Sequence, residues 1–220
     1  MVYQYEYPRP MVTVDIVVLR YYDDELQLLL INRKHPPFVN HWALPGGYIQ
    51  MDETTYEAAQ RELQEETSLN TELLFPILVA DDPERDPRGR TISHVYCVLL
   101  PPPFPEVTAG DDAGGIRWFS LSNLPELAFD HKQVFDRAIE ELRFHLTVRL
   151  KIIALLDEIF PVKMLFNLLE NIGFPPTLGV NTLNRCLKLN ILEKTEGDLY
   201  RKMIDEDQLF NLGSRTLLQE

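Results

Sequence analysis

The chain has 220 residues and a formal net charge of −13, with 45% hydrophobic and 25% charged residues. These proportions are ordinary for a soluble globular protein, and a core of this size forms without disulfides or a structural metal. Residues 1–146 hold 12 Lys and Arg against 24 Asp and Glu, whereas residues 147–220 hold 9 against 10. The first part would repel nucleic acid at long range, which argues against nucleic-acid binding there. The balanced second part neither demands nor forbids a polyanionic partner.

The start of the chain and its two cysteines bear on the compartment. The first ten residues lack the basic start and apolar core of a signal peptide, and no run reaches the roughly 20 apolar residues of a membrane span. Cys97 and Cys186 lie far apart and show no metal-ligand spacing. We therefore expect a cytoplasmic protein with reduced thiols and no membrane partner.

The first two thirds of the chain mix strands and helices. In chain order, apolar and β-branched runs predict strands over residues 11–20 and 26–32, followed by a proline-containing loop and by Gly46–Gly47, which we expect to break regular structure. A helix is predicted over residues 54–67, strands over 73–80, 91–100 and 116–120, and a second helix over 130–147. This order has no regular βαβ repeat, so it favours an α+β domain with a mixed sheet.

A second, smaller unit is expected beyond the long helix. Helical patterns at residues 164–171 and 181–189 precede two short apolar pieces, Ile191–Leu192 and Leu199–Tyr200. Two helices followed by a small hairpin are typical of a winged helix. We place the boundary between a main domain at 1–146 and a winged-helix-like domain at 147–220.

The strongest chemical signal is a carboxylate cluster. Glu62, Glu65 and Glu66 stand at i, i+3 and i+4 of the first predicted helix, so they share one face. Such carboxylates repel one another unless a cation lies among them, and Mg²⁺ prefers oxygen ligands. The alternative for these residues alone is a solvated acidic helix face.

Neighbouring residues add to this cluster. Arg61 precedes the three glutamates, and an Arg61–Glu53 ion pair would tie the preceding loop to the helix. Gly46 and Gly47 would let the backbone approach a metal and offer a carbonyl oxygen as a ligand.

Residues 47–69 resemble the Nudix box, Gly-x5-Glu-x7-Arg-Glu-U-x-Glu-Glu-x-Gly-U, where U is a bulky aliphatic residue. The matching positions are Gly47, Glu53, Arg61, Glu62, Leu63, Glu65, Glu66 and Leu69. One position departs, because Ser68 stands where the family has glycine. Glycine ends the helix there at little cost in a left-handed conformation, and serine would cost about 1 kcal/mol.

The resemblance implies a Nudix α/β/α sandwich around a mixed sheet. It also implies metal-dependent hydrolysis of a nucleoside diphosphate linked to another moiety, through a metal-activated water. By position, Glu62 and Glu66 would be the main ligands of Mg²⁺, Glu65 a further ligand, and the Gly46 carbonyl would complete the site. Mn²⁺ suits the same oxygen ligands, so the metal preference stays open.

Two further stretches narrow the substrate. Residues 85–94, with the run Asp-Pro-Arg-Gly-Arg, resemble a stretch of ADP-ribose pyrophosphatases and of Nudix-derived transcription regulators, and residues 109–113 resemble the Gly-Asp-Asp-Ala loop of the pyrophosphatases. The resemblance implies hydrolysis of ADP-ribose to AMP and ribose 5-phosphate, with another nucleoside-diphosphate sugar or NADH as alternative substrates. It also implies that Asp111 or Asp112 serves as the general base or reaches the metal. We select Asp112.

Cationic and aromatic residues offer contacts for such a substrate. Guanidinium groups suit phosphate through paired hydrogen bonds, so Arg33, Arg88 and Arg90 are expected to reach the diphosphate. Ion pairing within an acidic loop is the alternative for Arg88 and Arg90. Trp42 and Phe38 would wall the base or the ribose, or else belong to the core.

A rival interpretation comes from the second unit. The chain also resembles Nudix-derived transcription regulators of NAD metabolism, which join a Nudix domain to a DNA-binding winged helix and sense ADP-ribose. Against a regulator, the box keeps its glutamates, and residues 181–190 carry only Arg185 and Lys188 as positive groups. DNA binding requires several phosphate contacts. We favour a homodimeric enzyme over a DNA-binding regulator, and a pure ADP-ribose sensor comes third.

Overall fold

The main sheet has seven strands. In the computed structural model, which describes residues 6–110 and 113–211, they are β1 (Met11–Tyr22), β2 (Glu25–Arg33), β3 (Trp42–Ala43), β4 (Gly46–Tyr48), β5 (Leu74–Ala80), β6 (Thr91–Leu99) and β7 (Ala113–Ser120). Their order is β3-β2-β1-β6-β5, with β4 also paired to β1 and β7 to β2. Strands β1 and β6 run parallel and the other pairs are antiparallel, so the predicted mixed sheet is confirmed.

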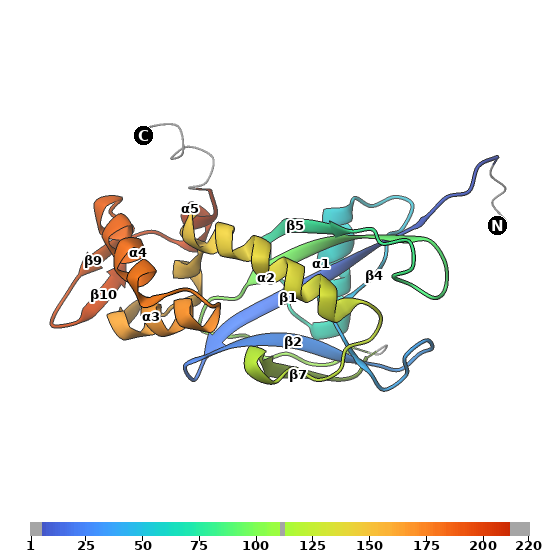
Figure 1. Cartoon of the computed structure of the whole chain (residues 1–220), viewed down its shortest axis with the longest axis horizontal. Coiled ribbons are helices and arrows are strands. Elements are labelled where there is room, and N and C mark those ends of the chain that lie inside the picture. The colour runs from blue at the N-terminus through green and yellow to red at the C-terminus, as the bar shows by residue number, and fades with distance from the viewer. Residues whose placement is uncertain (1–5, 111–112, 212–220) are drawn as a thin grey trace.

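Two helices cover opposite faces of this sheet (Figure 1). Strand β1 alternates between two cores, since successive side chains of a strand point to opposite faces. Val14, Ile16 and Val18 pack in the cluster that contains Leu63 of α1 (Thr55–Thr67). Val17, Leu19 and Tyr21 join the cluster that contains residues of α2 (His131–Thr147). The predicted α/β/α sandwich is therefore confirmed.

The prediction for Gly46–Gly47 was wrong, because these glycines lie in strand β4. Gly46 pairs with Asp15 and Gly47 with Val14 in an antiparallel ladder. Gly46 has φ +151°, and a Cβ atom there would collide with the Val14 carbonyl oxygen. Here glycine permits a close approach of two strands instead of ending one.

The chain then continues into a smaller helical and β unit. After a 3-10 turn at Leu121–Asn123 and α2 come a second 3-10 turn at Lys151–Leu155, β8 (Ile159–Pro161), α3 (Val162–Asn171), α4 (Pro176–Lys188), β9 (Leu192–Lys194), β10 (Leu199–Lys202) and α5 (Glu206–Asn211). The three short strands form a sheet in the order β8-β10-β9. The two helices and the hairpin were predicted, whereas β8 and α5 were not. Helix α4 also begins earlier than expected, since its first residue is Pro176, which suits a first helical position.

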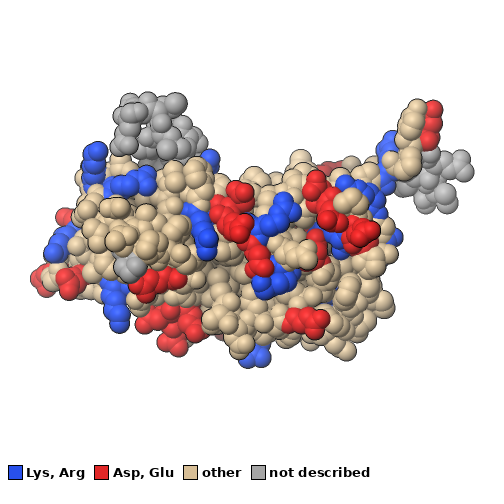
Figure 2. All heavy atoms as spheres, viewed as in Figure 1, with Lys and Arg blue, Asp and Glu red and all other residues tan. Residues whose placement is uncertain are grey.

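This second unit packs against the sandwich. The cluster beneath α2 continues through Ile152 and Ile153 to Leu165 and Leu168 of α3. The Leu26 N–H of β2 donates to Asn171 Oδ1 over 3.1 Å. Basic and acidic side chains are interspersed over the face shown in Figure 2. Among the described residues, no helix is long and apolar enough to cross a membrane.

Candidate active site

Helix α1 is held at both ends by local hydrogen bonds. A capping box starts it, in which Thr54 Oγ1 accepts from the Glu57 N–H and the Glu57 carboxylate accepts from the Thr54 N–H. Ser68 ends it with φ 61°, the left-handed conformation that glycine would adopt more easily. The hydroxyl groups of Ser68 and Thr108 lie 2.6 Å apart, which offsets part of the strain. The departure from the box thus leaves the helix end in place.

Arg61 bonds several groups of the box and is the hub of the site. Its Nη2 lies 2.6 Å from Glu53 Oε1, so the predicted Arg61–Glu53 ion pair is confirmed. Its Nη1 pairs with Glu62 Oε1 at 2.7 Å and Glu65 Oε2 at 3.1 Å, and Nη2 donates to the Tyr48 carbonyl. Hydrogen bonds to Glu53, together with those to Glu62 and Glu65, raise the pKa of Arg61. One guanidinium therefore ties α1 to the loop before it and to β4.

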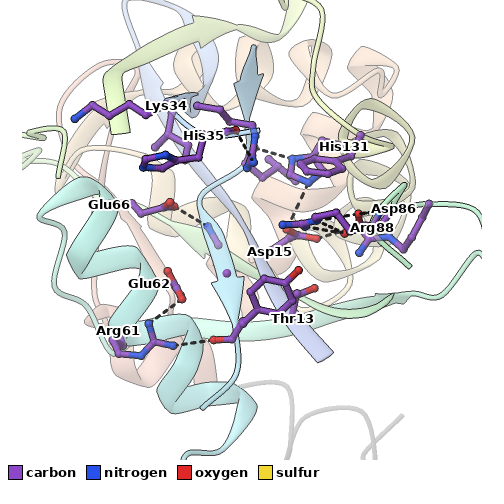
Figure 3. Close-up of a pocket in the computed structure, with 18 of the residues that line it drawn as sticks. Thr13, Asp15, Lys34, His35, Arg61, Glu62, Glu66, Asp86, Arg88 and His131 are labelled. Carbon is purple, nitrogen blue, oxygen red and sulfur yellow. Dashed lines mark hydrogen bonds and ion pairs between the residues drawn. The ribbon is translucent and has the colours of Figure 1, made fainter. Parts of the chain in front are cut away.

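Glu62 and Glu66 both face strand β4 from α1 (Figure 3). The Glu62 carboxylate lies against Gly47, where an added Cβ atom would collide with it. Burial raises the pKa of Glu62, despite the opposing effect of Arg61. Glu66 Oε2 accepts from the Gly46 N–H over 2.8 Å. Glu65 differs, because its side chain is 59% exposed and turns to Arg61, and it is not among the residues that line the pocket.

The donor set fits a divalent cation. Desolvation raises the pKa of the partly buried Glu62 carboxylate, and a cation beside it would favour the charged form. Carboxylate and carbonyl oxygens are the ligands that Mg²⁺ and Mn²⁺ prefer. Over the described ranges, no three acidic, His or Cys side chains already form a cation site. The hydrogen bonds above explain this, since Arg61 holds Glu62 and Glu65 and a backbone N–H holds Glu66.

Glu62 and Glu66 line a pocket of about 420 Å³, which cationic and aromatic side chains also line. Arg33 and Arg88 both line it, with their guanidinium carbons 4.8 Å and 5.1 Å from the centre of the Phe129 ring. Arg88 also pairs with Asp86 at 2.7 Å. Arg90 does not line this pocket, contrary to expectation, because its Nη1 donates to the Asp81 carbonyl on the outer loop.

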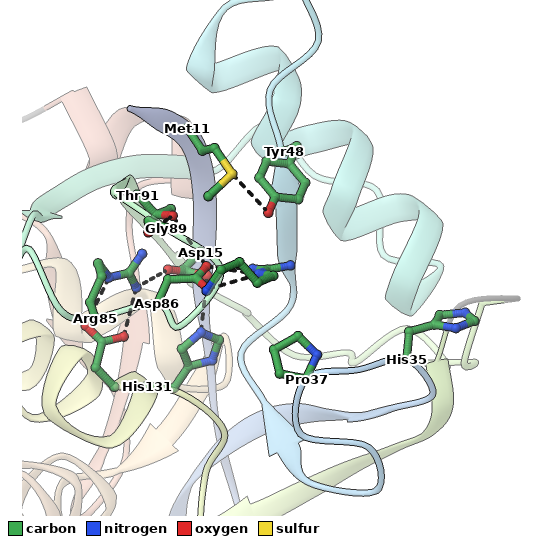
Figure 4. Close-up of polar contacts among 12 residues, drawn as sticks. Met11, Asp15, His35, Pro37, Tyr48, Arg85, Asp86, Gly89, Thr91 and His131 are labelled. Carbon is green, nitrogen blue, oxygen red and sulfur yellow. Dashed lines mark hydrogen bonds and ion pairs between the residues drawn. The ribbon is translucent and has the colours of Figure 1, made fainter. Parts of the chain in front are cut away.

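A buried ion-pair network forms the floor of the pocket (Figure 4). Arg85 Nη2 lies 3.1 Å from Asp15 Oδ2 and 2.9 Å from Asp130 Oδ1. His131 Nδ1 accepts from the Leu44 N–H over 3.0 Å, so a neutral ring carries its proton on Nε2, which lies 3.6 Å from Asp15 Oδ1. Burial lowers the pKa of His131 and favours this neutral form.

This network was not predicted from the sequence. One signal was available, since Asp15 is a lone acid within an alternating apolar strand, and a buried charge needs partners. Its partner Arg85 is 70 residues away, so no local spacing reveals the pair.

The remaining predicted residues are Asp111, Asp112, Trp42 and Phe38. Asp111 and Asp112 lie outside the described residues. The preceding Gly110 N–H donates to the Glu66 carbonyl over 3.2 Å, so the loop reaches the end of α1. Trp42 packs against Phe119, whereas Phe38 packs against Phe129 and lines a neighbouring cavity.

Comparisons with known proteins agree with this geometry. A family model described as NUDIX domain matches residues 10–138. The ADP-ribose pyrophosphatase of Methanocaldococcus jannaschii is 42% identical over 128 residues, which cover 58% of this chain and 72% of that protein. The ADPR responsive transcriptional repressor NtrR of Acinetobacter baylyi is 28% identical over 193 residues, covering 86% of this chain and 74% of that protein.

A solved structure extends the likeness to most of the chain. The MutT/nudix family protein from Enterococcus faecalis superposes with a TM-score of 0.76 at 26% identity, covering 91% of this chain and 89% of that one. The matched family region covers more than half of the chain and contains β1, α1 and the pocket floor. The chain belongs to the Nudix family.

Proposed function

We propose that this protein is a metal-dependent Nudix hydrolase that converts ADP-ribose to AMP and ribose 5-phosphate. The observation that carries the proposal is that carboxylates and guanidinium groups line one pocket. Glu62 and Glu66 of the box line it together with Arg33 and Arg88. Such a pocket suits a diphosphate held between a cation and guanidinium groups. The 42% identity to an ADP-ribose pyrophosphatase supports the choice of substrate.

Each residue of the site has a proposed role. Glu62 and Glu66 hold Mg²⁺, or Mn²⁺ in its place, with the Gly46 carbonyl and Glu65 as further ligands. When bound, the ion offsets charge on the diphosphate and lowers the pKa of a water molecule. Arg61 and Glu53 hold the glutamates in place, and Gly47 leaves room for Glu62.

The remaining assignments concern the substrate and the proton. Arg33 and Arg88 bind the diphosphate, because both guanidinium groups line the pocket. Asp112 takes the proton of the attacking water, as the loop before it reaches the end of α1 through Gly110. Arg90 contributes only if the loop that carries it rearranges on binding.

The direct test is AMP release from ADP-ribose, with and without Mg²⁺ and with a chelator control. Metal-dependent release of AMP and ribose 5-phosphate supports the proposal. If no AMP forms while ADP-ribose still raises the melting temperature, the protein binds the nucleotide without cutting it, and the hydrolase proposal fails.

A DNA-binding regulator is the second candidate. The observation that favours it is the similarity to a transcriptional repressor over 86% of this chain, which includes the C-terminal unit. The order of helix, helix and hairpin there also suits a winged helix, and we propose that residues 147–220 form one.

Charge argues against DNA binding. Arg185, on the helix that would read DNA, donates to the carbonyls of Thr147 and Val148 over 2.9 Å and 3.0 Å. Its exposed guanidinium is thus already bonded to the protein's own backbone. The hairpin over residues 192–202 has no excess of positive charge, since its acidic residues Glu193, Glu196 and Asp198 balance Lys194, Arg201 and Lys202. Salt-dependent binding of duplex DNA at low ionic strength, without AMP release, would favour the regulator.

We further propose that the protein is a cytoplasmic homodimer and has no membrane partner. Light scattering coupled to size-exclusion chromatography tests the dimer. A mass near 25.6 kDa, that of one chain, would contradict it.

A further inference from the structure

Phe129 has an unusual backbone conformation at the edge of the pocket. Its φ is 53°, in the left-handed region that costs a non-glycine residue about 1–2 kcal/mol. The surrounding main chain holds it there, since the Ala128 N–H donates to the Trp42 carbonyl and the His131 N–H donates to the Ala128 carbonyl. Strain of this kind persists where the structure enforces it, and it is frequent at functional sites.

The conformation brings the Phe129 ring between groups that belong to the pocket. The guanidinium carbons of Arg33 and Arg88 lie 4.8 Å and 5.1 Å from the ring centre. The Phe38 ring, at 4.7 Å, and the His131 ring, at 5.4 Å, pack against the same side chain. A cation over an aromatic face within about 6 Å is attracted by the ring quadrupole. Phe129 is therefore a contact that two cations of the pocket share.

Each arginine is also anchored away from the ring. Arg33 Nε donates to the Pro37 carbonyl over 3.0 Å. Arg88 donates from Nε and Nη2 to the Asp86 carboxylate. Two like charges beside one ring repel each other, and an anion between them would relieve that repulsion. The ring limits how far the two long side chains can separate while the anion is absent.

The next residue, Asp130, also directs its side chain to the pocket floor. Asp130 occupies the N-cap of α2, yet its side chain makes no capping hydrogen bond. Its carboxylate pairs instead with Arg85 on the pocket floor. An aspartate cap is worth about 1 kcal/mol, so the turn at 128–131 is arranged for the pocket and not for the helix.

We infer that Phe129 is a positioning residue that holds Arg33 and Arg88 as a pair for the diphosphate of the substrate. The inference rests on the proposed function, because it assigns a diphosphate to this pocket. It predicts that the ring matters for binding the anion and matters little for the chemical step, since Phe129 contacts the arginines and not the glutamates.

The test compares Phe129→Leu, Phe129→Tyr and the matched control Phe119→Leu. Phe119 also lies under an arginine, Arg117 at 5.1 Å, but outside the pocket. The readouts are KM and kcat for ADP-ribose with Mg²⁺, and the Kd of inorganic pyrophosphate by calorimetry in a metal-free buffer. Melting temperatures show which variants fold, and Phe129→Met replaces Phe129→Leu if the latter does not.

The expected result is a rise of about 10-fold in KM and in the pyrophosphate Kd of Phe129→Leu, the size of a partly desolvated cation–π contact. Its kcat stays within about threefold of the wild type, Phe129→Tyr keeps wild-type KM and Kd, and so does Phe119→Leu. The inference is overturned if Phe129→Leu keeps the wild-type KM and Kd. It is also overturned if KM and Kd rise equally in Phe119→Leu and Phe129→Leu.

The pyrophosphate measurement separates this inference from the proposed function. If the wild type does not cut ADP-ribose, the proposed function fails, and the pyrophosphate Kd alone then judges Phe129. Tight binding of pyrophosphate by the wild type with about 10-fold weaker binding by Phe129→Leu would still support the positioning role. No binding of pyrophosphate by the wild type would overturn it.

Discussion

The hydroxyl groups of Ser68 and Thr108 lie 2.6 Å apart at the point where helix α1 ends in a left-handed turn. The bond joins the box to the loop that follows β6. Glycine would adopt φ 61° without strain, whereas serine is strained there, and the hydrogen bond to Thr108 offsets part of that strain.

This relationship predicts different free energies of unfolding for two substitutions at position 68. Ser68→Ala keeps the strain and loses the hydrogen bond, so the free energy of unfolding should fall by about 1 kcal/mol. Ser68→Gly loses the same bond but relieves about 1 kcal/mol of strain, so it should stay within about 0.5 kcal/mol of the wild type. Urea denaturation measures both, and equal losses in the two variants would contradict the argument.

Arg61→Lys should destabilise the protein although it keeps the charge. A lysine ammonium cannot bond Glu53, Glu62 and the Tyr48 carbonyl together, as the planar guanidinium does. Losing hydrogen bonds to charged, partly buried groups should lower the free energy of unfolding by about 2 kcal/mol.

The control for Arg61→Lys is Arg137→Lys, since Arg137 makes an exposed bond of 3.3 Å to the Val79 carbonyl. A surface change of this kind should stay within about 0.5 kcal/mol. If Arg61→Lys and Arg137→Lys unfold at the same urea concentration, Arg61 is not the hub of the site.

Glu66→Gln should fold normally and lose turnover. The amide oxygen still accepts from the Gly46 N–H, so the contact between α1 and β4 survives. The negative charge on the proposed cation is lost, and several kcal/mol of transition-state stabilisation depend on that ion, which corresponds to about 100-fold or more in kcat.

The matched control for Glu66→Gln is Glu141→Gln on the exposed side of α2, which removes a carboxylate far from the pocket. AMP release and melting temperature are measured for both variants. A Glu66→Gln variant with an unchanged rate would show that Glu66 does not hold the metal.

Protonation of His145 should make the free energy of unfolding fall as the pH is lowered. Burial, followed by the charges of Lys151 and Arg149, lowers the pKa of His145 to about 4, against about 6.5 for an unfolded histidine. Between these values the unfolded chain binds more protons, so the free energy of unfolding falls as the pH drops from about 6.5 to about 4. His145→Leu should flatten this dependence.

The pH series compares the urea midpoints of the wild type and of His145→Leu from about pH 6.5 to about pH 4. Identical slopes for the wild type and His145→Leu would mean that His145 is not the group that titrates.

Much of the site was predictable because its signals are local. The capping residue Thr54, the spacing of Glu62 and Glu66, and the Arg61–Glu53 pair all lie within one helix and the turn before it. Local spacing sets which side chains share a helix face, and alternation sets which face of a strand is buried. The same rules gave the mixed sheet and the covering helices.

The sequence by itself thus determined the family, the order of the longer strands and helices, and the acidic residues of the pocket. Only the tertiary structure decided the rest. It made Gly46–Gly47 a strand, left Glu65 and Arg90 outside the pocket, and joined Asp15 to Arg85. Each of these outcomes depends on a contact or on a side-chain orientation that the spacing of residues along the chain does not determine. The packing of distant segments sets which strands pair and which side chains meet.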